Sequence, residues 1–172
     1  MLFLTAPHEM YRESYLEALQ EFHAEGRNLR YDLAQLTQDF GSFVYKLLAL
    51  SDPLQTTPPQ ITQTILWLIY GAEFIGRISL RQELDEHMAR YGGHIGYEIR
   101  PSKRNQGYGR QILTLGLEKA RELGLLKILV TCDINNIPSK RIILCNGGIF
   151  ESTVELGNEA TKILRYWIDL GE

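Results

Sequence analysis

The sequence predicts an α/β protein, in the broad sense that includes α+β, whose strands form one mixed sheet. A short strand pattern and three helical patterns come first, and strand patterns rich in β-branched and aromatic residues follow, interrupted by two further helical patterns. The 172 residues, of which 44% are hydrophobic and 23% charged, have the length and composition of one globular domain. We therefore expect a single domain that covers residues 1–172.

The N-terminal third predicts one short strand and three helices. The expected elements are a strand at 2–4, a helix from Thr5 or Ala6 to about Gly26, and helices at 29–40 and 43–50. Pro7 would lie in the first helical turn, which tolerates proline because the backbone N–H has no helical partner there. Proline-containing stretches at 51–53 and 57–59 predict a surface connection to the next element.

The rest of the chain alternates between strands and helices. The expected elements are strands at 62–70, 74–81 and 93–99, a short helix or loop at 83–91, a helix at 108–123, a strand at 127–133, a helix at 138–145, and final strands at 150–156 and 162–170 joined around Gly157-Asn158. One apolar face of the helix at 108–123 should enter the core; it is formed by Ile112, Leu113, Leu115, Gly116, Leu117 and Ala120.

Charge and cysteine usage exclude several function classes. The net charge of −3 and the pI near 5.8 argue against a nucleic-acid partner, since such proteins usually carry a basic surplus. Cys132 and Cys145 lack metal-ligand spacing and predict reduced thiols and no metal. No apolar run approaches a membrane span, and the N-terminus lacks a signal-peptide pattern. We therefore expect cytoplasmic residence and no membrane partner.

The segment Arg100–Arg110 is the clearest indication of function. It lies between the strand expected at 93–99 and the helix expected at 108–123, so it forms a short loop that enters a helix N-terminus. Unpaired backbone N–H groups and the positive end of the dipole favour an anion there, and glycine lets a phosphate approach closely. Cationic side chains add to the same region: Arg100, Lys103, Arg104 and Arg110. The loop predicts a phosphate-bearing ligand.

The glycine spacing of this loop excludes the two commonest phosphate-binding motifs. No Gly-x-x-x-x-Gly-Lys-Ser/Thr run occurs in the chain. Gly107-Tyr108-Gly109 is followed by Arg110-Gln111-Ile112, so the third glycine of a dinucleotide fingerprint is missing. What remains is Arg-x-x-Gly-x-Gly, formed by Arg104, Gly107 and Gly109.

This motif resembles the acyl-CoA loop of the GNAT superfamily of N-acetyltransferases, Gln/Arg-x-x-Gly-x-Gly/Ala. The predicted element order is similar to the whole fold of that superfamily, a mixed, mostly antiparallel twisted sheet flanked by helices. The stretches 71–81 and 92–101 also resemble a branch of predicted bacterial acetyltransferases. The resemblance implies an acetyltransferase that moves an acetyl group from acetyl-CoA directly to a primary amine, with acetyl-CoA as cosubstrate and no metal.

The resemblance also implies a set of site residues. The strand end at Glu98, Ile99 and Arg100 would offer backbone groups to the acetyl carbonyl and the pantetheine arm, and Asn136 and Ser139 would lie along that arm. The pyrophosphate would be held by the backbone N–H groups of Arg104, Asn105, Gln106, Gly107, Tyr108, Gly109 and Arg110. Asn105 stands where the family commonly has glycine, and asparagine tolerates the left-handed conformation better than most residues.

Two proton transfers need side chains. A free alkyl amine has a pKa of about 10, so an attacking amine needs a general base or a desolvating site. Glu98 is the candidate base, because it sits on the central strand immediately before the loop, near where the thioester should lie; its alternative role is that of a solvent-facing residue or an ion-pair partner of Arg100 or Arg77. Many relatives place a tyrosine, serving as general acid, at the position of Ile143, which cannot donate a proton. Tyr97 and Tyr108 are further candidates for that role.

Other functions stay open at this stage. The acceptor could be a small polyamine, an amino acid, an antibiotic amine or a protein N-terminus. A non-catalytic acyl-CoA-binding regulatory module would also fit, given the absent tyrosine. A nucleotide-binding regulatory domain that prefers ATP or NAD is a weaker alternative, because the third glycine is missing. The two final strands could pair across subunits and form a homodimer.

Overall fold

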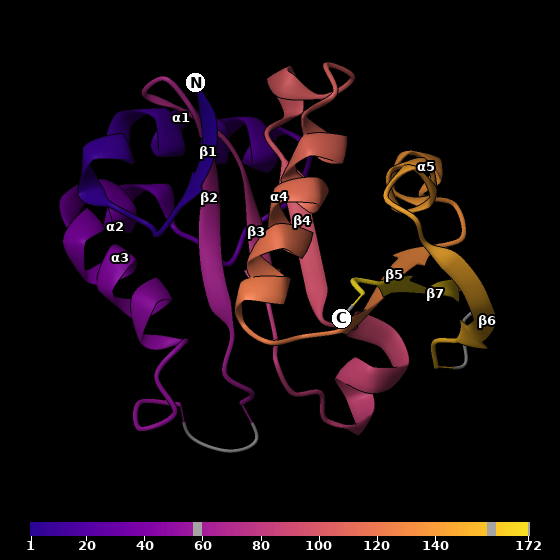
Figure 1. Cartoon of the computed structure of the whole chain (residues 1–172). Coiled ribbons are helices and arrows are strands. Elements are labelled where there is room, and N and C mark those ends of the chain that lie inside the picture. Colours follow the sequence, from indigo (N-terminus) through magenta and orange to yellow (C-terminus); the bar gives the residue numbers. More distant parts are fainter. Residues whose placement is uncertain (57–59, 158–160, 172) are drawn as a thin grey trace.

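One seven-stranded sheet organises the structure, with helices on both of its faces (Figure 1). The computed structural model describes residues 1–56, 60–157 and 161–171. Residues 57–59, which belong to the expected surface connection, and Asn158, at the expected junction of the final strands, lie outside the described residues. Within the described ranges, no helix is both long and apolar enough to cross a membrane.

The elements follow the predicted order closely. In chain order they are β1 (Leu2–Thr5), the 3-10 turn η1 (Glu9–Tyr11), α1 (Arg12–Ala24), α2 (Leu33–Gln38), α3 (Phe40–Ala49), β2 (Thr64–Tyr70), β3 (Glu73–Leu80), the π-helical turn η2 (Met88–Gly92), β4 (Ile95–Ile99), the 3-10 turn η3 (Pro101–Lys103), α4 (Tyr108–Glu122), β5 (Lys127–Asp133), α5 (Ile137–Cys145), β6 (Ile149–Glu155) and β7 (Lys162–Asp169).

The sheet is mostly antiparallel, as the resemblance implied. Its strand order is β1-β2-β3-β4-β5-β7-β6, and β4 and β5 form the parallel pair at its centre. The other neighbouring strands pair antiparallel. The predicted α/β class with a mixed sheet is therefore confirmed.

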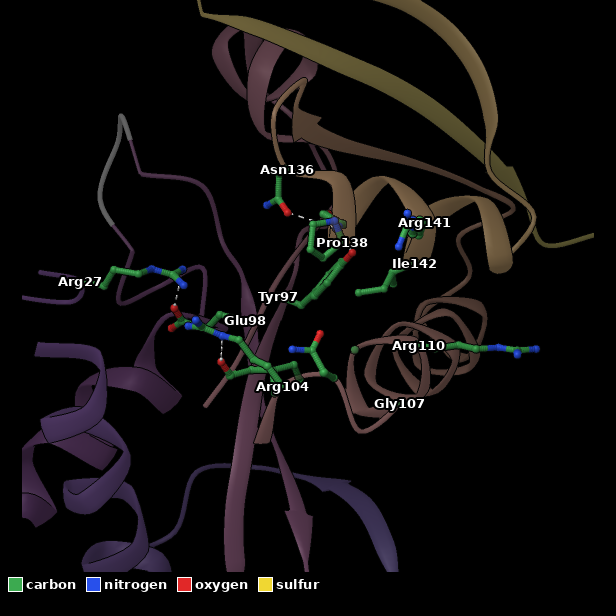
Figure 2. Close-up of a pocket in the computed structure, with 14 residues that line it drawn as sticks. Arg27, Tyr97, Glu98, Arg104, Gly107, Arg110, Asn136, Pro138, Arg141 and Ile142 are labelled. Atoms are coloured by element: carbon green, nitrogen blue, oxygen red, sulfur yellow. Dashed lines mark hydrogen bonds and ion pairs between the residues drawn. The ribbon is translucent and has the colours of Figure 1, made fainter. Parts of the chain in front are cut away.

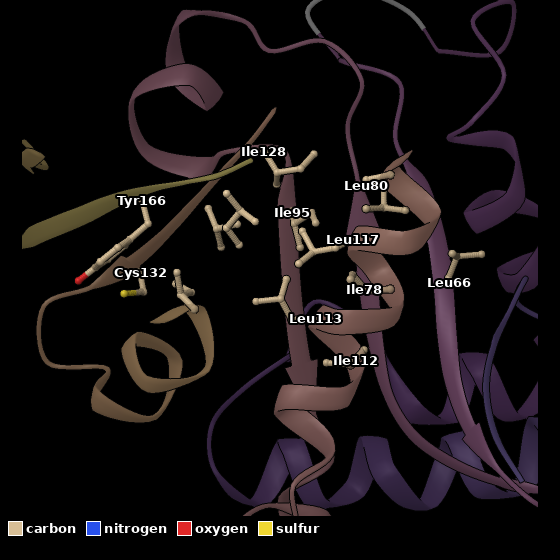
Figure 3. Packing of buried hydrophobic residues seen from close by; sticks show 14 of the residues in the cluster. Leu66, Ile78, Leu80, Ile95, Ile112, Leu113, Leu117, Ile128, Cys132 and Tyr166 are labelled. Carbon is tan, nitrogen blue, oxygen red and sulfur yellow. The ribbon is translucent and has the colours of Figure 1, made fainter. Parts of the chain in front are cut away.

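Two hydrophobic cores lie on opposite faces of this sheet, because β2 buries alternate residues in each. Leu66 and Leu68 face the core under α4. Figure 3 shows Ile112, Leu113 and Leu117 of α4 directed into this core. Gly116 allows the close approach, since a Cβ there would lie 2.2 Å from Ile78 Cδ1. The apolar face predicted for this helix is confirmed, with Leu115 partly buried at its edge.

The second core is aromatic and lies under α1, α2 and α3. Trp67 of β2 is fully buried and stacks on Tyr15 of α1 with ring centroids 4.8 Å apart. Phe74 of β3 meets the Trp67 ring edge-on at 5.4 Å, and Phe40 and Phe43 of α3 close around Tyr15. Such aromatic pairs add about 0.5–1.5 kcal/mol beyond area burial. This packing fixes the N-terminal helices against β2 and β3.

Side-chain caps move three helix boundaries away from their predicted positions. The first helical segment begins with the 3-10 turn η1 at Glu9, not at Thr5 or Ala6, because His8 Nδ1 accepts the Met10 N–H at 3.1 Å and leaves Pro7 outside; α1 follows from Arg12. Aspartates then divide the stretch 29–50 differently. Asp32 caps α2 through the Gln35 N–H at 2.7 Å, and Asp39 caps α3 through the Ser42 N–H at 3.0 Å.

Candidate functional site

The central strands β4 and β5 separate soon after they pair. Their register contains one pair, Ile95 with Val130. On its other side β4 bonds to β3 through alternate residues, including an N–H of Arg100 that donates to the Ile75 carbonyl at 2.8 Å. The backbone groups of Tyr97 and Ile99 therefore point toward β5. Within the described chain they find no strand partner, and the Ile99 carbonyl accepts only Arg104 Nε at 3.2 Å.

A cavity of about 530 Å³ occupies this opening between β4, the loop that follows it and α5. Figure 2 shows its two ends: Gly107 and Arg110 lie at one, Arg27 and Glu98 lie at the other, and Tyr97 lies between them. The lining residues are Arg27, Tyr97, Glu98, Ile99, Arg104, Asn105, Gly107, Gly109, Arg110, Asn136, Pro138, Ser139, Arg141 and Ile142.

The loop at the first end exposes a row of backbone N–H groups. Asn105 and Gly107 both adopt left-handed conformations, with φ of 60° and 86°. The Arg104 N–H donates to Pro101 and the Arg110 N–H donates to Gly107, so neither is free. The five N–H groups from Asn105 to Gly109 have no acceptor among the described residues. An anion could accept several of these bonds at once, at a helix N-terminus.

Gly109 has a packing role that spacing alone could not reveal. A Cβ at this position would lie 2.5 Å from Ile142 Cδ1 of α5, whereas a Cβ at Gly107 would meet nothing closer than Gln111 Nε2 at 3.8 Å. Gly107 is therefore required for its backbone conformation and Gly109 for the approach of α4 to α5.

Three of the four basic side chains expected around the phosphate form ion pairs with glutamates instead. Arg100 is buried and bonds to α1 through Glu21 at 2.7 Å and Glu17 at 3.2 Å, with Glu73 of β3 at 3.6 Å. Lys103 also pairs with Glu73, at 2.7 Å, and Arg104 forms a double contact with Glu25. Arg110 and Arg141 line the cavity, are exposed and have no ion-pair partner in the described part of the chain.

The middle of the cavity carries a short hydrogen-bond chain. Asn136 caps α5 by accepting the Ser139 N–H at 3.1 Å, and the Ser139 hydroxyl lies 2.9 Å from the Tyr97 hydroxyl. Burial raises the pKa of Tyr97 to about 12, so its proton is retained at neutral pH. Ile143, one turn after Ser139, is fully buried in the core and offers no polar group.

Glu98 lies at the second end and is held by three neighbours. Arg77 Nε contacts Oε1 at 2.6 Å, Asn28 Nδ2 lies 3.2 Å from both oxygens, and Arg27 lies 3.4 Å from Oε2. The Glu98 side chain is 11% exposed. Pairing with Arg77 was one of the alternatives that the sequence left open. Arg27 and Asn28 were missed, because nothing in the sequence connects them to a residue about seventy positions away.

Most of the predicted cofactor-binding residues meet at this cavity. Ile99, Arg104, Asn105, Gly107, Gly109, Arg110, Asn136 and Ser139 all line it. Gln106 instead donates through Nε2 to the Ser102 carbonyl at 3.0 Å, and Tyr108 packs partly buried against the core. The Arg100 side chain does not reach the cavity. No group of three or more His, Cys, Asp and Glu side chains within the described ranges is arranged to hold a metal ion.

Comparison with known proteins defines the class to which this fold and cavity belong. The acetyltransferase (GNAT) domain model matches residues 11–148. The chain therefore belongs to the GNAT acetyltransferase family.

Individual relatives are more distant. An uncharacterized N-acetyltransferase, YnaD, from Bacillus subtilis (strain 168) is 32% identical over 90 residues, which cover 49% of this chain and 51% of that protein. The microcin C7 self-immunity acetyltransferase MccE, solved with acetyl-CoA and AMP, has a TM-score of 0.71 at 16% identity, covering 98% of this chain and 92% of its own. A Salmonella typhimurium acetyltransferase that modifies the N-terminal serine of ribosomal protein L7/L12 has a TM-score of 0.66 at 16% identity, covering 98% and 94%. These two structures share the fold of this chain.

Proposed function

We propose that this protein transfers the acetyl group of acetyl-CoA to a primary amine. The observation that carries the proposal is the row of five backbone N–H groups from Asn105 to Gly109, which lack acceptors among the described residues and open on the cavity. A pyrophosphate supplies acceptors of matching charge. The structure of MccE with acetyl-CoA, on the same fold, supports acetyl-CoA as the cosubstrate.

The cavity has groups suited to each part of acetyl-CoA. The N–H groups from Asn105 to Gly109 would hold the pyrophosphate, and Arg110 and Arg141 would add positive charge beside them. The pantetheine arm can pair with the backbone of Tyr97 and Ile99, which β5 leaves open. Asn136 and Ser139 on α5 would flank the arm on its other side.

The proposed reaction is direct. The amine nitrogen forms a bond to the thioester carbonyl carbon, the carbon–sulfur bond breaks, and the CoA sulfur leaves with the bonding electron pair. A proton is lost from the nitrogen and one is gained by the sulfur. We assign the first transfer to Glu98, whose carboxylate is fixed by Arg77 and Asn28 at the far end of the cavity. Of the three contacts that Glu98 makes, the one with Arg27 is the longest, at 3.4 Å. An incoming amine could take the place of Arg27 beside the carboxylate.

Tyr97 is the proposed proton donor to the sulfur. It lies between the two ends of the cavity, its raised pKa keeps it protonated, and Ser139 fixes its hydroxyl at 2.9 Å (Figure 2). Many relatives are expected to use a tyrosine of α5 as the proton donor, at the position where this chain has Ile143. Because Ile143 has no polar group, Tyr97 of β4 would supply the proton instead. Tyr108 is the weaker candidate, since it does not line the cavity.

A non-catalytic acyl-CoA-binding regulatory module is the second candidate function. It is favoured by Ile143 and by the ion pairs that hold Glu98, because both reduce the groups available for proton transfer. The single-domain organisation, cytoplasmic residence and a homodimer stay predictions. The dimer proposal rests on β6, an edge strand on which Ile149 is 70% exposed and Phe150 is 53% exposed.

Two glycine-to-tryptophan variants test the proposal by calorimetric titration with acetyl-CoA, CoA and ATP. Gly107 and Gly124, close to opposite ends of α4, have φ of 86° and 85°, and a Cβ meets little at either position. Both substitutions therefore impose the same backbone strain and bulk. We expect micromolar acetyl-CoA binding that is lost in Gly107→Trp and retained in Gly124→Trp. Release of free thiol with amines then separates the enzyme from the binding module. Absence of acetyl-CoA binding by the folded wild type would refute both functions.

A further inference from the structure

The second end of the cavity is positively charged although the chain as a whole carries −3. Two arginines pair with one carboxylate there, and a third is linked to them through Tyr31. Arg77 contacts Glu98 with its side chain 24% exposed, and Arg27, which lines the cavity, contacts it with its side chain 49% exposed. Arg30 is outside the cavity lining but is linked to this pair: it covers the Tyr31 ring at 4.7 Å, bonds to the Tyr31 hydroxyl at 3.2 Å, and Tyr31 also contacts Arg77.

Arg77 already balances the charge of Glu98, because their contact at 2.6 Å is shorter and less exposed than that of Arg27 at 3.4 Å. Of the neighbouring acids, Glu25 forms a double contact with Arg104, whereas Asp32 accepts the Gln35 N–H, a neutral donor that leaves its negative charge in place. Arg27 and Arg30 together carry one more positive charge than Asp32 can balance, and both side chains are exposed and accessible to a molecule that arrives at this end of the cavity.

This end of the cavity is where an acceptor has to arrive. If the pyrophosphate occupies the end at Gly107, the acyl group at the tip of the pantetheine arm would reach toward Glu98 and Arg27, which lie at the opposite end in Figure 2. The acceptor would then enter beside Arg27, whose side chain is 49% exposed. An acceptor with several ammonium groups would meet unbalanced arginines there. An acceptor with a negative group would be attracted and could form charge-assisted hydrogen bonds.

We propose that the acceptor is an amine with an acidic group close to it, bound by Arg27 and Arg30 while the amine faces Glu98. The inference rests on the proposed function, because it needs the acyl group to reach this end of the cavity. A free acidic amino acid and the N-terminus of an acidic peptide share this chemistry. A polyamine does not.

Binding and turnover are measured separately to test this inference. The CoA-loaded protein is titrated calorimetrically with a peptide beginning alanine–aspartate–glutamate, its alanine–asparagine–glutamine counterpart, free aspartate and spermidine. We expect the acidic peptide to bind about tenfold more tightly than the neutral one, as for a charge-assisted contact. If free aspartate binds equally well, a small acceptor is indicated; if only the peptide binds, a protein N-terminus is.

A double variant and a control variant test whether the two arginines cause the preference for the acidic peptide. Arg27→Gln/Arg30→Gln should abolish the preference for the acidic peptide, without changing acetyl-CoA affinity. Lys127→Gln is the control, since this exposed lysine at the start of β5 is outside the cavity lining. Equal or tighter binding of the neutral peptide or spermidine, or a preference that survives the double variant, would overturn the inference.

Thiol release distinguishes this inference from the proposed function. Turnover of spermidine but of no acidic acceptor would support acetyl transfer and overturn the inference. Arginine-dependent binding of the acidic peptide without turnover of any amine would have the opposite meaning. It would support an acidic ligand at this end of the cavity and refute the enzyme.

Discussion

The two ends of the cavity differ in the chemical groups that form them, backbone N–H groups at one end and side chains at the other. At the first end the chain offers its own backbone: five consecutive N–H groups, shaped by the left-handed conformations of Asn105 and Gly107. At the second end it offers side chains from distant segments, with Arg27 and Asn28 after α1, Arg77 on β3 and Glu98 on β4.

This difference explains what each end can recognise. Backbone groups have the same chemistry in every protein, so the first end suits the invariant phosphates of a shared cosubstrate. Side chains vary without disturbing the backbone, so the second end can suit a particular acceptor. The predictions below test whether the two ends are as separate as this comparison implies.

Loss of Arg100 should have the largest effect, and it should be structural. Arg100→Ala leaves Glu17, Glu21 and Glu73 facing one another without the buried cation that joins α1 to β4. We expect the free energy of unfolding to fall by about 3 kcal/mol in urea titrations, as when one partner of a buried ion pair is removed. Arg110→Ala is the control and should cost less than about 0.5 kcal/mol. Unchanged stability with lost acetyl-CoA binding would make Arg100 a phosphate ligand instead.

Glu98→Gln should separate chemistry from cosubstrate binding. We expect kcat for thiol release to fall about 100-fold, because an amide cannot accept the amine proton, while acetyl-CoA affinity stays within about twofold. Glu122→Gln on the exposed part of α4 is the control. An unchanged kcat would mean that Glu98 only orders Arg77 and Arg27, and that the acceptor loses its proton to water.

The sequence predicted the first end far better than the second, for a physical reason. A strand, a glycine-bearing loop and a helix are contiguous, so the left-handed conformations of Asn105 and Gly107 could be anticipated from neighbouring residues, whereas the packing of Gly109 against Ile142 could not. The partners of Glu98 are brought together only by the packing of α1 against the sheet. Sequence spacing contains no information about that distance.

The same reason explains why most of the basic side chains expected around the phosphate form ion pairs within the protein. Arg100, Lys103 and Arg104 are basic residues of a phosphate loop in the sequence, but in the structure they meet the glutamates of α1 and β3. Glutamates recur at every fourth position along α1 and at its C-cap, as Glu17, Glu21 and Glu25, and this pattern could have been recognised in the sequence. It indicates an acidic helix face that needs a basic partner, though not which one.

Tyr97→Phe should slow the departure of CoA and leave the core intact. The ring is retained, so stability should change little, whereas kcat should fall about tenfold with acetyl-CoA. An acyl donor with a more acidic thiol needs less help from a proton donor, so the defect should shrink with it. Ser139→Ala retains the tyrosine proton and should have a smaller effect. Equal defects with both donors would indicate positioning without proton transfer.

Arg110→Gln should weaken acetyl-CoA binding by less than about tenfold, a smaller effect than that of Gly107→Trp. Its exposed side chain can add charge near the phosphates but supplies none of the five N–H groups. Calorimetry at low and high salt should show that the difference from wild type disappears as salt screens it. A loss as large as that of Gly107→Trp would mean that side chains, not the backbone, dominate this end as well.

The smallest expected effect concerns His94, which holds β4 to β5 immediately before the two strands separate. The backbone N–H of His94 donates to the Leu129 carbonyl at 2.8 Å, and the ring Nδ1 of His94 accepts the Leu129 backbone N–H at 2.9 Å. Burial holds the pKa of His94 below its usual 6.5, with a smaller contribution from Arg81. The unfolded chain therefore binds the proton more readily, so this contribution to stability is present above about pH 6.5 and is lost as pH falls below it.

Urea titrations between pH 7.5 and 5.5 should show this loss, and His94→Asn should reduce its slope while lowering stability at pH 7.5. Acetyl-CoA affinity of the wild type should decline over the same range, because both ends of the cavity depend on where β4 leaves β5. Identical slopes in the two proteins would show that protonation of His94 does not weaken this junction. An affinity decline that persists in His94→Asn would assign the pH dependence to the cavity itself.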